Sequence, residues 1–150
     1  MLKVLTHSWP LLMGVMLLMV GNGIQGTLLG IRGNLEGFTT YQLSYIMAAY
    51  FLGFLFGSWA APKMIRQVGH VRVFAALGSL ISAILVIYPV YPDWLIWTLL
   101  RVFAGFCFSG IYITAESWIN NTASNETRGQ ALSAYMIVQM LGLVSGQVLV

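Results

Sequence analysis

The stretch LLRVFAGFCFSGIYITAESW, residues 99–118, is almost entirely apolar and yet contains two charged residues, Arg101 and Glu116. In a helix, which rises about 1.5 Å per residue, these charges would lie roughly 22 Å apart, so they cannot form an ion pair. An apolar run of about 20 residues is long enough to cross the hydrocarbon of a membrane. The stretch therefore predicts a transmembrane helix in which each charge needs polar surroundings of its own.

The composition of the whole chain also indicates a membrane protein. Hydrophobic residues make up 59% of the 150 residues and charged residues only 7%, whereas soluble domains are about 25% charged. The net charge of +3 comes from basic residues scattered between apolar runs, and this distribution disfavours nucleic-acid binding. The single cysteine, Cys107, excludes an intramolecular disulfide and is interpreted as a small buried hydrophobic residue.

Five apolar segments each approach the length that a helix needs to span hydrocarbon. The first resembles a signal peptide, but it is too long for one and precedes four further segments. The predicted fold is an all-α, polytopic transmembrane helix bundle formed by one N-terminal domain, residues 1–150. Because the last segment ends without a polar flank, we expect the chain to be part of a longer protein. Helices are expected at about residues 10–31, 41–61, 73–91, 94–116 and 131–150.

The connections contain residues that favour turns and helix starts. RGNLEGFTT (32–40) offers Thr39 or Thr40 as the N-cap of the second helix. The polar connection NNTASNETRG offers Ser124 or Asn125 as the N-cap of the fifth helix.

The basic residues predict the orientation of the chain in the membrane. With the N-terminus inside, most basic residues of the connections fall on the cytoplasmic side, which is the usual bias. They are Lys3, Lys63, Arg66, Arg72 and Arg128, against Arg32 outside. In the basic connection PKMIRQVGHVRVF (62–74), Pro62 is expected to end the second helix and Gly69 to allow a turn, while His70 is interpreted as an ordinary polar residue.

A polar stripe follows one side of the fourth helix. At about 100° per residue, its members fall within an arc of roughly 80°. They are Thr98, Arg101, Gly105, Ser109, Tyr112 and Glu116. Charges inside a membrane usually face a bundle interior or a hydrated cavity, so the stripe predicts a polar path. Two alternatives remain open: Arg101 reaches the outer surface near Asp93 or Glu36, and Glu116 pairs with basic residues at the cytoplasmic surface.

The first helix has a similar polar face in GNGIQGTLLG (21–30), where Asn22 and Gln25 lie one turn apart among glycines. The amides suit either a solute path or contacts between helices, and both interpretations stay open. Small residues at spacing four predict close packing of the second and fifth helices. They are Ala49, Gly53, Gly57 and Ala61, together with Gly142 and Gly146.

The short basic connection and the spacing Arg101-x-x-x-Gly105 occur together with three longer stretches: YFLGFLFGSWAAPKMIRQVGHVRVFAAL, RVFAGFCFSGIYITAESWINN and ETRGQALSAYM. On these features the sequence resembles the N-terminal half of a Major Facilitator Superfamily transporter, and specifically an uncharacterised bacterial subgroup. The resemblance implies a protein of twelve helices in two halves, with the first and fourth helices lining a central cavity. The C-terminal half of the same transporter is then an expected partner.

Two departures from the family pattern are visible. The cytoplasmic loop motif of the family, Gly-x-x-x-Asp-Arg-x-Gly-Arg-Arg, is echoed by Gly69, His70 and Arg72, but its acidic position is missing. We therefore expect Glu116 to act as the acidic partner of a cytoplasmic gate formed by Lys63, Arg66, Gly69, His70, Arg72 and Arg128. The fifth helix reads LGLVSGQ and lacks the Gly-Pro signature of drug antiporters, which disfavours drug–proton exchange.

These features predict a secondary active transporter in the bacterial inner membrane that moves a small solute by alternating access, with proton coupling. Asn22, Gln25, Arg101, Ser109, Tyr112 and Glu116 are the expected pathway residues. The alternative is a membrane receptor or scaffold that transports nothing. With only two histidines and no nucleophile–base pair, metal cluster or phosphate loop, neither an enzyme nor a cofactor or metal is expected.

Overall fold

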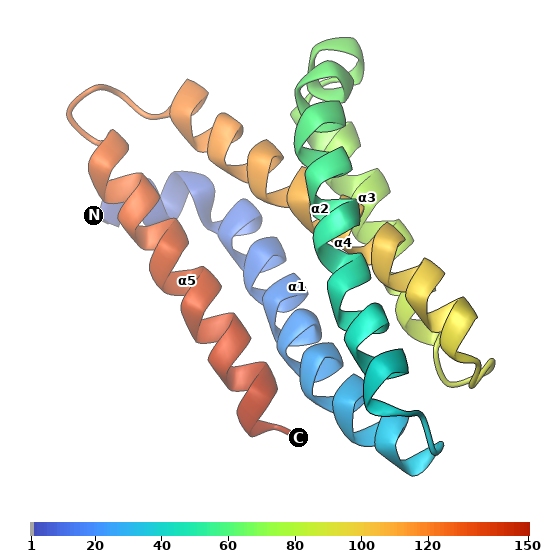
Figure 1. The fold of residues 1–150 in the computed structure, drawn as a ribbon. Helices are drawn as coiled ribbons and strands as arrows, with labels where there is room; N and C mark the ends of the chain where they lie inside the picture. The colour runs from blue at the N-terminus through green and yellow to red at the C-terminus, as the bar shows by residue number, and fades with distance from the viewer. Residues whose placement is uncertain (1) are drawn as a thin grey trace. The chain divides into compact units, whose positions relative to one another are not determined.

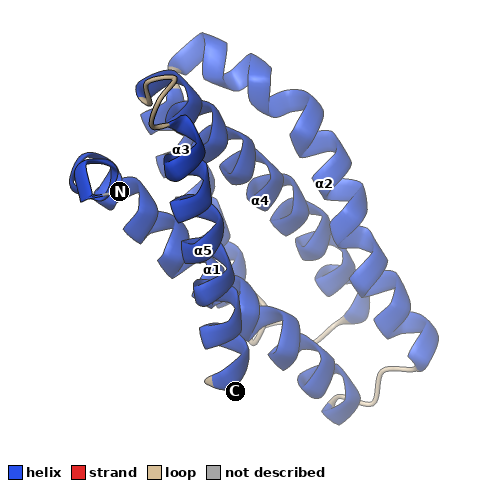
Figure 2. Ribbon diagram, turned by 90° about the vertical axis from the view of Figure 1, so that its left-hand side faces the viewer, coloured by secondary structure: helices blue, strands red, loops and turns tan. Residues whose placement is uncertain are grey.

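The computed structural model describes residues 2–150, and in this range helices are joined by short loops without any strand (Figure 2). The helices are α1 (Leu2–Leu35), α2 (Thr40–Val68), α3 (His70–Ile87), α4 (Trp94–Thr122) and α5 (Arg128–Val148) (Figure 1). Each of them is long and apolar enough to cross a membrane. The predicted fold class, an all-α polytopic membrane protein, is confirmed.

The chain divides into two compact units, which are described separately. The central unit comprises Gly30–Thr114, with α2, α3 and most of α4. The terminal unit comprises the chain up to Leu29 and from Ala115 onward, with most of α1, the end of α4 and α5.

Glycines bring α2 and α4 of the central unit into backbone contact. A Cβ atom on Gly53 would overlap the carbonyl of Val102, and one on Gly105 would overlap the carbonyl of Tyr50. Gly57 meets the backbone of Phe106 in the same way. Such contacts let two membrane helices approach closely without the volume of side chains between them.

In the terminal unit, glycines likewise allow close backbone contact between α1 and α5. A Cβ atom on Gly146 would overlap the carbonyl of Val20, and one on Gly142 would lie 2.7 Å from the carbonyl oxygen of Met16. From the other side, a Cβ atom on Gly23 would overlap the carbonyl of Leu143. The two helices run side by side in this unit (Figure 1).

Side-chain caps fix the starts of two helices. Thr39 is the N-cap of α2: its hydroxyl accepts a hydrogen bond from the amide of Gln42, whose side chain accepts one from the amide of Thr39. Asp93 performs the same role for α4, since its Oδ1 accepts hydrogen bonds from the amides of Leu95 and Ile96. The cap at Asp93 was missed by the sequence analysis, although an acidic residue directly before an apolar run is a recognisable signal.

Removing the cap of α2 provides a test of this local structure. We expect Thr39→Ala to lower the free energy of unfolding by about 1 kcal/mol, because the amide of Gln42 loses the hydroxyl that accepts its hydrogen bond. The measurement is the SDS mole fraction at which half of the detergent-solubilised protein loses its helical circular dichroism. Thr40→Ala is the matched control, and an equal loss in both variants would contradict the capping role of Thr39.

The second helix continues through Pro62, so the prediction that this proline ends it is wrong. Gly69, with φ of 89°, ends α2 instead, and its amide donates to the carbonyl of Ile65. A proline removes one backbone hydrogen bond, and membrane helices tolerate that loss when neighbouring groups satisfy the freed carbonyl. The basic segment is therefore not a loop, because Gly69 alone separates α2 from α3.

The start of α5 also differs from the prediction. Its N-cap is Thr127, without a side-chain capping bond, rather than Ser124 or Asn125. Ser124 instead forms a closed turn with Thr127, in which each side-chain oxygen accepts from the amide of the other residue. The helices otherwise extend beyond most of the predicted bounds, because polar residues continue them past the apolar runs from which those bounds were taken.

Candidate functional site

Arg101 lies inside the central unit although it carries a charge. It stands seven residues after the start of α4, about 10 Å along the helix, and is only 7% exposed. The carbon of its guanidinium group is 4.6 Å from the centre of the Tyr50 ring, at the distance of a cation–π contact. Its Nε has no hydrogen-bond partner among residues 2–150. The guanidinium is thus held against an aromatic ring with a donor left unused.

An aromatic cluster between α2 and α4 continues from this contact. The ring of Tyr50 lies 6.0 Å from Phe54 and 6.4 Å from Phe108, and Tyr112 lies 6.0 Å from Phe54. Both Tyr50–Phe54 and Phe108–Tyr112 have the spacing of four that places residues on one helix face. The spacing is visible in the sequence, although only Tyr112 of these four residues was predicted to lie on the pathway.

The other members of the stripe on α4 have different surroundings. Ser109 is completely buried, and its hydroxyl has no hydrogen-bond partner among the described residues. Thr98 is half-buried and donates to the carbonyl of its own helix at Trp94. Tyr112 is half-buried, whereas Glu116 is exposed and belongs to the terminal unit. The structure therefore brings Arg101, Ser109 and Tyr112 into the central unit, and Glu116 lies outside it.

The two amides of the predicted path on α1 belong to the terminal unit. Asn22 is half-buried, and Gln25 is 5% exposed. Neither the amide oxygen nor the amide nitrogen of Gln25 has a hydrogen-bond partner within the part of the chain that the structure describes. A buried primary amide that forms no hydrogen bond is costly in a membrane, so its presence needs a reason other than stability.

The unpaired amide of Gln25 leads to a prediction with opposite signs for stability and activity. We expect Gln25→Leu to raise the free energy of unfolding by about 1–3 kcal/mol, since the unsatisfied buried groups disappear. Solute flux should fall in the same variant if the amide contacts the solute. SDS unfolding and vesicle flux measure the two effects. Thr27→Val is the control, because the Thr27 hydroxyl already donates to the carbonyl of Gly23. A variant that is less stable than the wild type would contradict the prediction.

The residues predicted to form a cytoplasmic gate lie at helix ends. Lys63 and Arg66 belong to the last turns of α2, His70 and Arg72 to the first turn of α3, and Arg128 begins α5. The ammonium group of Lys63 lies 3.5 Å from the centre of the Trp59 ring. Arg128 donates to the side chain of Asn125 and to the carbonyl of Asn120, so it holds the connection before α5.

The helices and their buried polar residues define a class of protein: a multi-pass helical membrane protein with charged and amide side chains inside its spans. Residues 11–150 match the sequence profile of the Major Facilitator Superfamily, which is nearly the whole chain. The chain belongs to this family.

Curated relatives are bacterial proteins with the same family assignment. An uncharacterised MFS-type transporter of Yersinia enterocolitica is 32% identical over 93% of this chain and 36% of its own length. Those of Enterobacter sp. and Escherichia coli are 30% and 31% identical, each over 97% of this chain and 39% of their own length. The chain thus spans little more than a third of these relatives. They are named as transporters, which agrees with the expectation that the chain is not an enzyme. No solved structure matches the chain significantly.

Proposed function

We propose that this protein is a secondary active transporter that moves a small organic anion across the bacterial inner membrane. It works by alternating access and is coupled to protons. The observation that carries the proposal is the buried guanidinium of Arg101, which lies in a membrane-spanning helix against Tyr50 and retains an unused donor. Charged residues inside membrane spans are costly and usually belong to a substrate or ion path.

The charge balance of the central unit favours an anion as the solute. Two carboxylates are present between Gly30 and Thr114, Glu36 and Asp93. Glu36 binds Arg32 at 2.8 Å, and Asp93 caps α4. Neither is left to neutralise Arg101, so a carboxylate or phosphate group of the solute is the counter-charge that we propose. A guanidinium group binds such groups with two parallel hydrogen bonds.

The other pathway residues have subordinate roles in this proposal. Asn22 and Gln25 supply hydrogen bonds to the solute, and Ser109 and Tyr112 extend the polar face of α4 beyond Arg101. Glu116 is the acidic partner of the gate residues Lys63, Arg66, His70, Arg72 and Arg128 on the cytoplasmic side. The surplus of basic residues on that side supports an N-terminus in the cytoplasm.

The experiment is a flux measurement with the purified protein in lipid vesicles. A pH gradient is imposed, and the uptake of radiolabelled mono- and dicarboxylates is compared with that of neutral sugars and organic cations of similar size. We expect uptake of one or more carboxylates above that of empty vesicles, and its loss when a protonophore collapses the gradient. Uptake of the neutral or cationic solutes alone would contradict the anion assignment, and no uptake of any class would contradict transport.

A further inference from the structure

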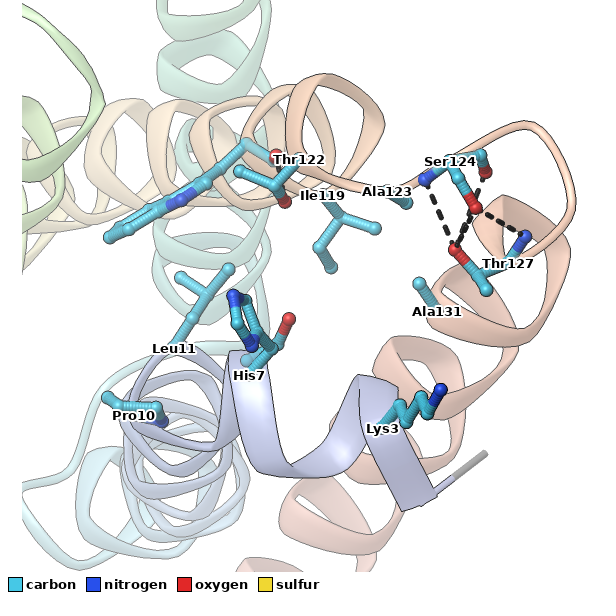
Figure 3. Close-up of a pocket in the computed structure, with 12 residues that line it drawn as sticks. Lys3, His7, Pro10, Leu11, Ile119, Thr122, Ala123, Ser124, Thr127 and Ala131 are labelled. Carbon is cyan, nitrogen blue, oxygen red and sulfur yellow. Dashed lines mark hydrogen bonds between the residues drawn. The ribbon is translucent and has the colours of Figure 1, made fainter.

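The terminal unit contains a pocket where three of its segments converge (Figure 3). The start of α1 forms one wall, the end of α4 forms the second, and the beginning of α5 with its preceding turn forms the third. The cavity has a volume of about 450 Å³, which lies in the range of pockets that hold small ligands. It is separate from Arg101, which belongs to the central unit.

The basic side chains of this pocket both come from α1. Lys3 and His7, four residues apart in α1, share a helix face and line the cavity. Neither side chain has a hydrogen-bond or ion-pair partner within residues 2–150. No aspartate or glutamate of the described chain lines the pocket. The electrostatics therefore favour an anion.

Three hydroxyl groups of the pocket are already engaged with the protein. The hydroxyl of Thr122 donates to the carbonyl of Trp118, and Ser124 and Thr127 are hydrogen-bonded to each other. This leaves the ammonium group of Lys3, the imidazole of His7 and the hydroxyl of Ser8, which also lines the cavity, as donors for a ligand. The wall beneath them is apolar and includes Leu11 and Ile119, which are buried (Figure 3).

The pocket lies where the membrane meets water. The connection of residues 123–127 directly follows the wall formed by α4, and its polar backbone must stay outside the hydrocarbon. Trp118, which lines the cavity, is a residue type that concentrates at this depth. A cationic rim beside an apolar wall at the interface matches a ligand with an anionic head and an apolar tail.

We propose that this pocket binds the phosphate headgroup of an anionic phospholipid, with Lys3 and His7 on the phosphate and an acyl chain along Leu11 and Ile119. Basic pockets between membrane helices bind anionic headgroups in this way. The site is independent of transport, so it holds or fails separately from the proposed function. A soluble phosphate would use the same two side chains but would gain nothing from the apolar wall.

The test compares lipids that differ only in headgroup charge. The purified protein is placed in nanodiscs of phosphatidylcholine, and dibrominated phosphatidylglycerol or dibrominated phosphatidylcholine is added in equal amounts. Bromine quenches the fluorescence of nearby tryptophans. The difference in fluorescence between the wild type and the Trp118→Phe variant isolates the signal of Trp118, and its quenching therefore reports lipid at the pocket. We expect Trp118 to be quenched at lower fractions of phosphatidylglycerol than of phosphatidylcholine. Equal quenching by the two lipids would overturn the proposal.

Two double variants test whether quenching by phosphatidylglycerol depends on the basic residues of the pocket. Lys3→Gln combined with His7→Gln should raise the phosphatidylglycerol fraction for half-quenching about fivefold or more. Both side chains are exposed, so the double variant should keep the thermal midpoint of the wild type in phosphatidylcholine. The matched control is Lys63→Gln with His70→Gln, which removes the same residue types from α2 and α3. An equal change in both double variants would overturn the assignment to this pocket.

Inorganic phosphate distinguishes the source of the anion. Phosphate is added to nanodiscs that contain brominated phosphatidylglycerol, at constant ionic strength. We expect millimolar phosphate to leave the quenching unchanged, because the apolar wall favours the lipid. Complete relief of quenching by millimolar phosphate would show a site for soluble anions and overturn the lipid assignment.

Discussion

Replacing Gly105 with alanine should destabilise the central unit by about 3 kcal/mol, although alanine is the better helix former. The added Cβ atom would overlap the carbonyl of Tyr50 and lie 3.0 Å from the amide nitrogen of Phe54. Both are backbone atoms of α2, so no side chain can rotate away and the helices must separate. Overpacking costs about 1–3 kcal/mol in general. A clash with a rigid backbone, which also weakens the aromatic cluster, should lie at the upper end.

The control is the same substitution where space is open. A Cβ atom on Gly26 meets no heavy atom within 4 Å, so Gly26→Ala should be neutral or should stabilise α1 by up to about 1 kcal/mol through helix propensity. SDS titration followed by circular dichroism measures both variants. Gly53→Ala, which acts from the other helix on the carbonyl of Val102, should behave like Gly105→Ala. Equal stability of Gly105→Ala and Gly26→Ala would refute the backbone contact between α2 and α4.

The sequence predicts the five spans well because a membrane imposes one strong constraint on each of them. A run of about 20 apolar residues must be a helix, because the hydrocarbon offers no water to its backbone polar groups. The ends of the helices are harder to predict, since the constraint disappears at the water interface. There, α2 continues through Pro62 to Gly69, and α4 extends to Thr122. Capping residues then determine where a helix begins. Thr39 was one of two predicted alternatives, and Asp93 was missed.

The surroundings of the polar residues depend on packing that periodicity does not encode. The helical projection placed Arg101 and Ser109 on one face, but the contact of Arg101 with Tyr50 requires knowledge of which helix lies opposite. The same holds for the pocket at Lys3 and His7, whose walls come from segments more than 100 residues apart. Sequence spacing identifies which residues share a face of one helix, and only the folded structure shows which helix packs against that face.

Arg101→Met is expected to leave a folded protein with solute flux lowered about 10- to 100-fold. Methionine fills much of the same volume, so the aromatic cluster keeps its packing. The loss of the contact with Tyr50 costs about 0.5–2 kcal/mol. Removal of a charge from the membrane interior stabilises the protein by about 2.5–3.5 kcal/mol. The variant should therefore be as stable as the wild type or more stable in SDS titration.

The fall in flux follows from the loss of a charged hydrogen bond to the solute, which contributes about 1.5–3 kcal/mol. Arg101→Lys should recover part of the flux, because it restores the charge but not the two parallel hydrogen bonds of a guanidinium. Arg32→Met is the matched control: this arginine is exposed and paired with Glu36, so its loss should change flux less than twofold. The flux is measured in vesicles under the same pH gradient for all variants. Wild-type flux in a stably folded Arg101→Met protein would remove the guanidinium from the transport path.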